Sequence, residues 1–270
     1  DEEELRILGR RHTAKEAALA VAHAQAAGFS NISLDLMLGI PQQTAQSVEK
    51  SIGFCAETGI THISAYLLKI EEGTPFDRNG VAARCPDPDE QAERYLQAVE
   101  ALARHGFCQY EISNFARPGR ESRHNLKYWT LQEYVGFGPG AHSDFGGRRF
   151  SFLRDLDGYI DGVLGGKPII DSDDLIPKRE RSGEYLMLRL RTTRGIEEWE
   201  YRREYFMNFD PIEAKLAEYE HNGWAARDGH RWRLTPIGFL ISNQLIGELL
   251  ERQESATLET TLPKIRKSPP

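Results

Sequence analysis

A helix, a glycine and a strand follow one another three times within the first 115 residues, and this repeat limits the fold more than any other feature. The predicted strands cover residues 31–38, 61–68 and 109–115. Capping residues and stop glycines frame the helices before them: Thr13, Gly28, Thr44, Gly59, Asp87 and Gly106. Because strands that alternate with helices pair in parallel, the repeat predicts an α/β fold with a parallel sheet.

Each predicted strand keeps one polar side, unlike the wholly apolar strands of ordinary doubly wound sheets. The residues on this side are Asn31, Ser33, Asp35, His62, Ser64, Tyr66, Gln109, Glu111 and Ser113. A closed or partly open barrel explains the pattern, because helices cover the apolar sides and the polar sides line a lumen for a ligand. Asp35 and Glu111, with Arg10 as the candidate counter-charge, are costly to bury without a purpose. Alternatively, the polar side chains satisfy one another inside a filled core.

The segment between residues 115 and 150 is rich in glycine, histidine and aromatic residues. Its run from Gly136 to Ser143 is not a dinucleotide-binding fingerprint, because Pro139 interrupts it and no helix start follows. The glycines allow the backbone to approach a flat ligand or another strand. His124 and His142 are candidate ligands of a metal or of haem iron, although hydrogen bonding is the commoner role of a lone loop histidine.

A second unit of helices and a hairpin is predicted after this segment. Helices around residues 180–190 and 211–222 precede two alternating runs joined by Asp228-Gly229, which is a strong hairpin signal. An apolar helix follows from Pro236. The pattern predicts a small winged-helix-like domain, for which a packing or lid role is favoured over DNA binding. Residues 251–270 have the composition of a disordered tail.

Composition narrows the partners and the location. Acidic residues outnumber basic ones by 41 to 34, so the net charge of -7 gives no general attraction to nucleic acid. No apolar run reaches the roughly 20 residues of a membrane span and no signal peptide precedes the fold, so we expect a cytoplasmic protein. Cys55, Cys85 and Cys108 are too widely spaced for a disulfide framework or a compact metal motif. Because the chain starts at Asp1 without a methionine, we expect it to be a piece of a longer protein.

Six motifs occur in a fixed order: residues 9–12, 31–37, 39–44, 109–116, 124–129 and 136–143. In this order they resemble the oxygen-independent coproporphyrinogen III oxidase-like radical S-adenosylmethionine proteins. The His-Asn-x-x-Tyr-Trp and Gly-Pro-Gly-Ala-His-Ser motifs are similar to those of the haem chaperone branch. The resemblance implies the C-terminal part of a radical S-adenosylmethionine partial (β/α) barrel over residues 1–168. A small winged-helix-like α+β domain over residues 169–250 and a tail over 251–270 follow.

The resemblance also implies site residues. Those for S-adenosylmethionine are Arg10, Asp35, Met37, Tyr66 and Lys69, and His124 is the candidate haem contact. Asp35 acts by polar contact and Arg10 by charge, while Met37 and Tyr66 lie near the adenine. Family members hold a [4Fe-4S] cluster with a Cys-x-x-x-Cys-x-x-Cys motif that this chain lacks. We therefore expect the chain alone not to cleave S-adenosylmethionine.

Three functions follow from the resemblance. The first is a haem chaperone that delivers haem to client proteins such as respiratory enzymes, with peripheral membrane contact compatible with that role. The second is an oxidase that decarboxylates coproporphyrinogen III in porphyrin biosynthesis. The third is a truncated fragment without activity.

Overall fold

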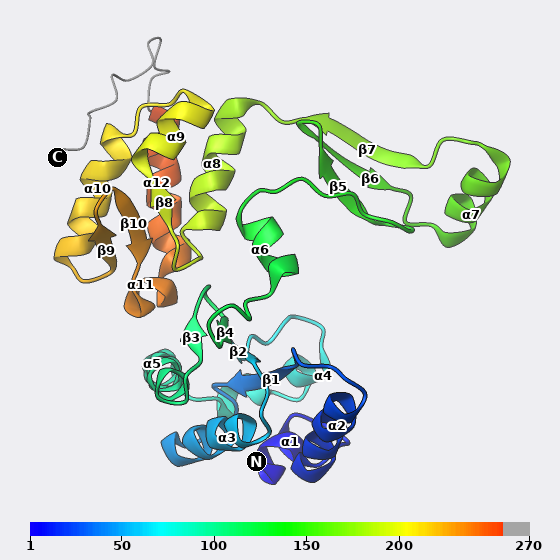
Figure 1. The fold of residues 1–270 in the computed structure, drawn as a ribbon, viewed down its shortest axis with the longest axis vertical. Helices are drawn as coiled ribbons and strands as arrows, with labels where there is room; N and C mark the ends of the chain where they lie inside the picture. The colour runs from blue at the N-terminus through cyan, green and yellow to red at the C-terminus, as the bar shows by residue number, and fades with distance from the viewer. Residues whose placement is uncertain (256–270) are drawn as a thin grey trace. The chain divides into compact units, whose positions relative to one another are not determined.

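The computed structural model describes residues 1–255, and these fold into two compact units (Figure 1). The first unit covers Asp1–Ser122, and the second begins at Arg123. The division lies earlier in the chain than residue 168, the expected end of the first domain. The segment with the histidine and glycine motifs therefore belongs with the helices that follow it.

The first unit is built on a four-stranded sheet with the order β1-β2-β4-β3. Strands β1 (Ser33–Leu38) and β2 (His62–Leu67) are parallel neighbours, which confirms the pairing predicted for the first two strands. The helices of this unit are α1 (Glu2–Ile7), α2 (Ala14–Ala26), α3 (Ala45–Glu57), α4 (Pro75–Arg78), the 3-10 helix η1 (Val81–Arg84) and α5 (Pro88–Arg104).

Local sequence sets the ends of the long helices. Thr13, Thr44 and Asp87 each accept a hydrogen bond from the backbone N–H of the third helical residue, whose side chain returns a bond to the capping residue. The predicted stop glycines all have positive φ: Gly28 (+95°), Gly59 (+75°) and Gly106 (+80°). The predicted boundaries of these helices are confirmed.

The third predicted strand, residues 109–115, is wrong as a single parallel strand. It forms a short hairpin of β3 (Cys108–Gln109) and β4 (Asn114–Ala116), and β4 runs antiparallel to β2. The turn is closed by the Tyr110 N–H, which donates to the Asn114 carbonyl at 3.1 Å. Glu111 and Ser113 therefore lie in a turn rather than on an alternating strand.

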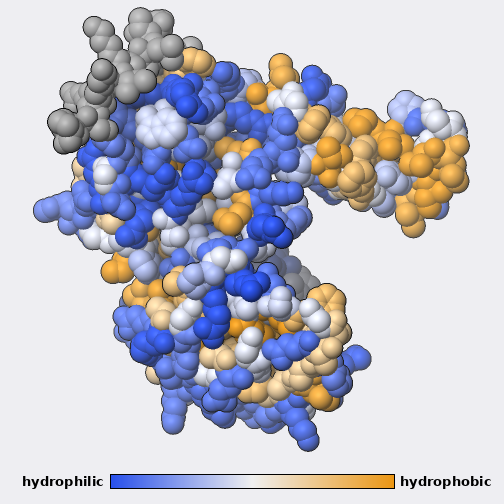
Figure 2. Space-filling model, in the orientation of Figure 1, coloured by the Kyte–Doolittle hydropathy of each residue, from blue (hydrophilic) through white to orange (hydrophobic). Residues whose placement is uncertain are grey.

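The second unit begins with helix α6 (Arg123–Trp129) and an antiparallel sheet. The sheet consists of β5 (His142–Phe145), β6 (Arg148–Phe152) and β7 (Ile170–Leu175), with α7 (Leu156–Gly165) between β6 and β7. We did not predict this sheet, because its glycine-rich first part has the composition of a ligand-binding loop. Figure 2 shows apolar surface along this part of the unit, where Leu164 is 81 % exposed and Leu175 is 67 % exposed.

The rest of the second unit packs helices around a three-stranded sheet with the order β8-β10-β9. Its elements are α8 (Lys178–Arg189), β8 (Ile196–Glu197), α9 (Glu198–Tyr205), α10 (Asp210–His221), β9 (Ala225–Asp228), β10 (Arg231–Leu234), α11 (Pro236–Leu240) and α12 (Ser242–Ser255). The hairpin predicted at Asp228-Gly229 is confirmed, with Gly229 at a φ of +59°. Trp232, Tyr201 and Tyr219 fill the core and are at most 1 % exposed.

The apolar helix predicted from Pro236 is interrupted at Ile241, so that two helices replace it. The second of them continues through residues 251–255, which were expected to belong to the tail. The remaining tail residues, 256–270, lie outside the described part of the chain. Among the helices that are described, none is both long enough and apolar enough to cross a bilayer.

Candidate functional site

One face of the β1-β2 pair carries three of the residues expected to bind S-adenosylmethionine. The register sets Asp35 opposite Ser64 and Met37 opposite Tyr66, and residues opposite each other in paired strands share a face. Asp35 is exposed and Tyr66 is 41 % exposed, whereas Ser64 is buried. In the described chain the face is therefore open at Asp35 and Tyr66, so of the closed or partly open barrel that the polar pattern predicted, these strands show no closed form.

His62 lies on the same face and joins it to the turn before β4. Its Nδ1 is 2.7 Å from the Ser33 hydroxyl, and its Nε2 is 2.8 Å from the Tyr110 hydroxyl. Burial lowers the pKa of His62, and the charge of Asp35 opposes this in part. Burial also raises the pKa of Tyr110 to about 12. The position of Tyr110 over this face was not predicted, because its side chain reaches His62 from a turn and not from an alternating strand.

The two expected cations are not brought to Asp35. Arg10 is exposed just after α1, and among residues 1–255 it forms no ion pair with Asp35 or Glu111. Lys69 pairs with Glu71 at 2.7 Å, and both side chains are more than half exposed. Exposed pairs of this kind contribute little to stability. The expectation that Arg10 supplies the counter-charge for two buried carboxylates is wrong, since Asp35 is exposed and Glu111 has no such partner.

Glu111 is buried in the turn between β3 and β4, with 1 % of its surface exposed. Its Oε1 has no hydrogen-bond partner. Burial raises the pKa of the Glu111 carboxyl, although hydrogen bonding from the Asn114 side chain and from the peptide N–H groups of residues 112–114 lowers it in part. An ionised Glu111 is therefore unfavourable in the folded chain.

The variant Glu111→Gln is expected to be more thermally stable than the parent at pH 7 and equally stable below about pH 4. A carboxyl with a raised pKa favours folding only while it is protonated, so the parent loses stability as the pH rises from the ordinary glutamate pKa through the raised value. Thermal unfolding of both proteins across this range measures the effect. Glu100→Gln, at an exposed position on α5, is the control and should show no such trend. A constant difference between parent and Glu111→Gln at all pH values would contradict the assignment.

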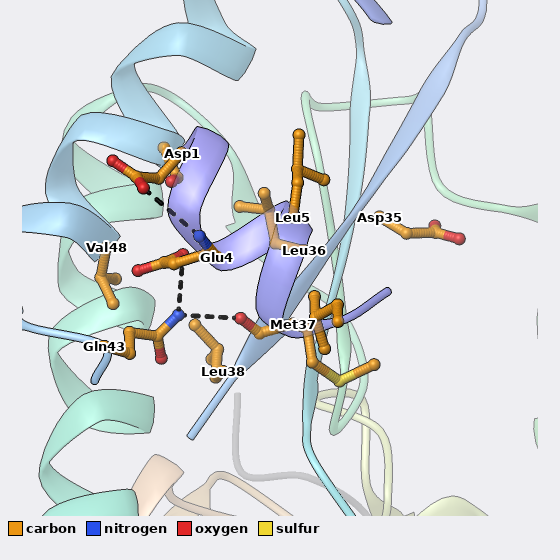
Figure 3. Close-up of a pocket in the computed structure, with 11 residues that line it drawn as sticks. Asp1, Glu4, Leu5, Asp35, Leu36, Met37, Leu38, Gln43 and Val48 are labelled. Carbon is orange, nitrogen blue, oxygen red and sulfur yellow. Dashed lines mark hydrogen bonds between the residues drawn. The ribbon is translucent and has the colours of Figure 1, made fainter. Parts of the chain in front are cut away.

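A small cavity of about 80 Å³ lies on the opposite face of β1, between this strand, α1 and α3 (Figure 3). Gln43 links β1 to α1 beside this cavity. Its Nε2 donates to the Met37 carbonyl at 3.0 Å and to the Glu4 carboxylate at 3.3 Å. Asp35 contributes to the lining but its carboxylate points away from Glu4, Gln43 and Val48. The cavity is far smaller than the roughly 300 Å³ or more of a typical cofactor pocket, and we assign no cofactor to it.

Helix α6 presents the candidate haem contact, His124, at its surface. The Tyr128 hydroxyl lies 3.3 Å from His124 Nε2, and the two rings meet edge to face with centroids 5.1 Å apart. Tyr128 also packs against Tyr134 at 4.8 Å. Within the described residues no hydrogen bond occupies His124 Nδ1, so this nitrogen is free to bind a metal. The participation of Tyr134 was not predicted, because it lies outside the His-Asn-x-x-Tyr-Trp motif.

A network of ion pairs fixes the segment that carries Tyr134. The Tyr134 N–H donates to the Asp144 carbonyl at 2.8 Å, and the Asp144 carboxylate binds Arg149 and Arg181. Although burial raises the pKa of Asp144, hydrogen bonds from Arg181 and Arg149 hold it below its usual range. Both arginines also bind Glu184 of α8, at 2.8 and 3.1 Å. The aromatic row beside His124 therefore rests on a fixed support.

The glycine-rich run before β5 brings two backbone segments together. A Cβ on Gly136 would lie 2.4 Å from the His142 carbonyl oxygen, so glycine is required there for close approach. The sequence left open whether the glycines allow the backbone to approach a flat ligand or another strand, and the structure shows the approach to a strand. His142 is exposed at the start of β5. In the described part of the chain, no three His, Cys, Asp or Glu residues are grouped closely enough to hold a metal ion.

Comparisons with known proteins identify relatives along most of the chain. Residues 176–241 match the HemN C-terminal domain family. The Heme chaperone HemW of Bacillus subtilis is 34 % identical over 91 % of this chain and 66 % of that protein, and HemW of Lactococcus lactis is 30 % identical over 91 % and 65 %. The structure of Escherichia coli coproporphyrinogen III oxidase, HemN, a radical SAM enzyme, matches with a TM-score of 0.73 at 17 % identity, over 92 % of this chain and 61 % of that one. The chain thus spans just under two thirds of the length of these relatives.

Proposed function

We infer that the chain belongs to the family of HemN-like proteins that includes HemW, and from this premise we propose that it is part of a cytoplasmic haem chaperone. In this proposal the whole protein binds haem, S-adenosylmethionine and a [4Fe-4S] cluster, and it delivers haem to client proteins such as respiratory enzymes. Residues 1–168 would be the C-terminal part of a partial (β/α) barrel, and residues 169–250 a winged-helix-like domain. The parallel β1-β2 pair supports the barrel assignment and the β9-β10 hairpin supports the winged-helix assignment, while residues 123–168 belong to the second compact unit.

The exposed His124 on α6 carries the haem assignment. Histidine is a common axial ligand of haem iron, and no hydrogen bond from residues 1–255 occupies His124 Nδ1. Tyr128, 40 % exposed, gives the porphyrin an aromatic edge beside that ligand. The histidine and the tyrosine are four residues apart on one helix, so a flat ligand can contact both without any change in the backbone.

The face of β1 and β2 is our candidate site for S-adenosylmethionine. Asp35 offers an exposed carboxylate to hydroxyl or amino groups, and Met37 with Tyr66 offers an apolar contact for adenine. We assign Arg10 and Lys69 to the same site by charge, although neither side chain contacts Asp35 in the described chain. The residues present therefore suit part of this ligand's surface.

The cysteines of this chain do not suit a [4Fe-4S] cluster. The cluster needs three thiolates, but Cys55 is buried in α3, and burial raises its pKa to about 11. Cys85 is half-buried and Cys108 is exposed. We therefore assign no cluster chemistry to the residues of this chain.

The second candidate function is oxidative decarboxylation of coproporphyrinogen III. The fold similarity to HemN favours it, and a tetrapyrrole would be the ligand in both cases. The two functions differ in the fate of the ligand, because a chaperone releases haem unchanged and an oxidase alters its substrate.

The proposal is tested by adding ferric haem to the protein and then offering the complex to a haem-free acceptor protein. We expect saturable binding of one haem per chain, followed by transfer of intact haem that is faster than transfer from free haem aggregates. Binding that never saturates, or bound haem that the acceptor cannot remove, would contradict a chaperone role. Conversion of coproporphyrinogen III by the longer protein, with its [4Fe-4S] cluster in place, would favour the oxidase.

A further inference from the structure

Helix α6 carries a second row of side chains beside His124 and Tyr128. Arg123 and Lys127 are also four residues apart, and each is the immediate neighbour of one member of the aromatic row. All four side chains are exposed. Successive residues of a helix point about 100° apart, so the two rows lie along adjacent strips of one surface.

Both cations in this second row lack a carboxylate partner. Neither Arg123 nor Lys127 forms an ion pair with any residue between 1 and 255. Two other exposed cations of the same unit are neutralised, since Arg148 pairs with Asp173 at 2.7 Å and Arg203 pairs with Glu204 at 2.6 Å, whereas Arg154 and Lys167 are exposed and have no carboxylate partner among the described residues. In a chain with a net charge of -7, two adjacent unpaired cations beside an aromatic pair form a local site for an anion with a flat ring.

We propose that Arg123 and Lys127 bind the carboxylates of the tetrapyrrole whose ring His124 and Tyr128 contact. The inference rests on the proposed haem-binding function and adds the chemical group that the site recognises. Haem has two propionate side chains on one edge of its ring. Arginine and lysine side chains are long enough to reach such an edge while the ring lies along the neighbouring row. The site therefore selects porphyrins with free carboxylates.

The test compares the double variant Arg123→Gln/Lys127→Gln with the parent protein, using ferric protoporphyrin IX and its dimethyl ester, in which both carboxylates are blocked. We expect the double variant to bind ferric protoporphyrin IX about 2- to 30-fold more weakly, the range for two exposed ion pairs. Its affinity for the dimethyl ester should equal that of the parent. The affinity of the parent for the free acid should also fall with added salt, and the variant should lose most of this dependence.

A matched control removes two exposed cations elsewhere in the same unit, with Arg154→Gln/Lys167→Gln. Thermal unfolding confirms that both double variants are folded. The inference is overturned if Arg123→Gln/Lys127→Gln binds the free acid as the parent does, or if the control variant loses as much affinity. In either case, if haem binding is still lost in His124→Ala, the proposed function stands although this inference fails. If the parent binds no haem, or binds it independently of His124, the proposed function and this inference both fail.

Discussion

Replacing Gly195 by alanine is expected to lower the free energy of unfolding of the second unit by more than about 4 kcal/mol. Such a loss is a large part of the total stability of a typical protein. A Cβ at this position would lie 1.9 Å from the carbonyl oxygen of Trp232, a distance that no side chain can occupy. The residue also has a φ of +63°, where alanine is strained. Because Trp232 is in the core and pairs with Ile196 of β8, the strand pair must separate to make room.

Gly229→Ala is the control that measures the strain of alanine at a positive φ without any steric clash. Gly229 has nearly the same φ, +59°, but a Cβ there meets nothing within 4 Å. It should cost only about 1–2 kcal/mol. Urea unfolding followed by tryptophan fluorescence measures both variants, and equal losses of stability would show that β8 and β10 do not approach as closely as described.

His124→Ala is expected to lower the affinity for ferric haem by more than the roughly 10- to 100-fold cost of changing an outer-shell residue of a metal site. The substitution removes the nitrogen that we assign to the iron and the ring that packs against Tyr128. Because the His124 side chain is exposed on the surface of α6, its removal should leave the temperature of the unfolding transition unchanged. Titration of ferric haem followed by visible absorbance measures the affinity.

His230→Ala removes another exposed histidine of the same unit, from the tip of the β9-β10 hairpin, and serves as the control. It should bind haem as the parent does. A similar loss in both variants would indicate non-specific coordination by surface histidines, and no loss in His124→Ala would show that haem binds elsewhere.

Much of the fold could be predicted from short-range sequence patterns. The capping boxes at Thr13 and Asp87, the stop glycines and the Asp228-Gly229 turn act through neighbouring residues, so their effects are visible in the sequence. The parallel pairing of β1 and β2 follows from the intervening helix. The family that the ordered motifs resemble is also the one found among the relatives that match most of the chain.

Most of the predictions that failed depended on distant partners. Alternation around Glu111 indicated a strand, but the Tyr95 hydroxyl donates to the Ile112 carbonyl at 2.9 Å and stabilises a turn there. In the β5-β6-β7 sheet, β7 pairs with β6 across a whole helix and is exposed along its length, so it lacks the alternation of a half-buried strand. The β5-β6 hairpin turns locally at Gly146-Gly147, and this signal was missed within the glycine-rich segment. The exposure of Asp35 depends on which elements cover β1, and no local pattern records that.

Pulsed electron paramagnetic resonance of the ferric haem complex tests the central claim most directly, because it detects nitrogen nuclei bound to the iron. With histidine labelled by ¹⁵N, we predict a histidine coupling in the parent and in His230→Ala, and its absence in His124→Ala. A coupling that persists in His124→Ala, or a parent complex with no histidine coupling, would contradict the assignment of α6 as the haem site.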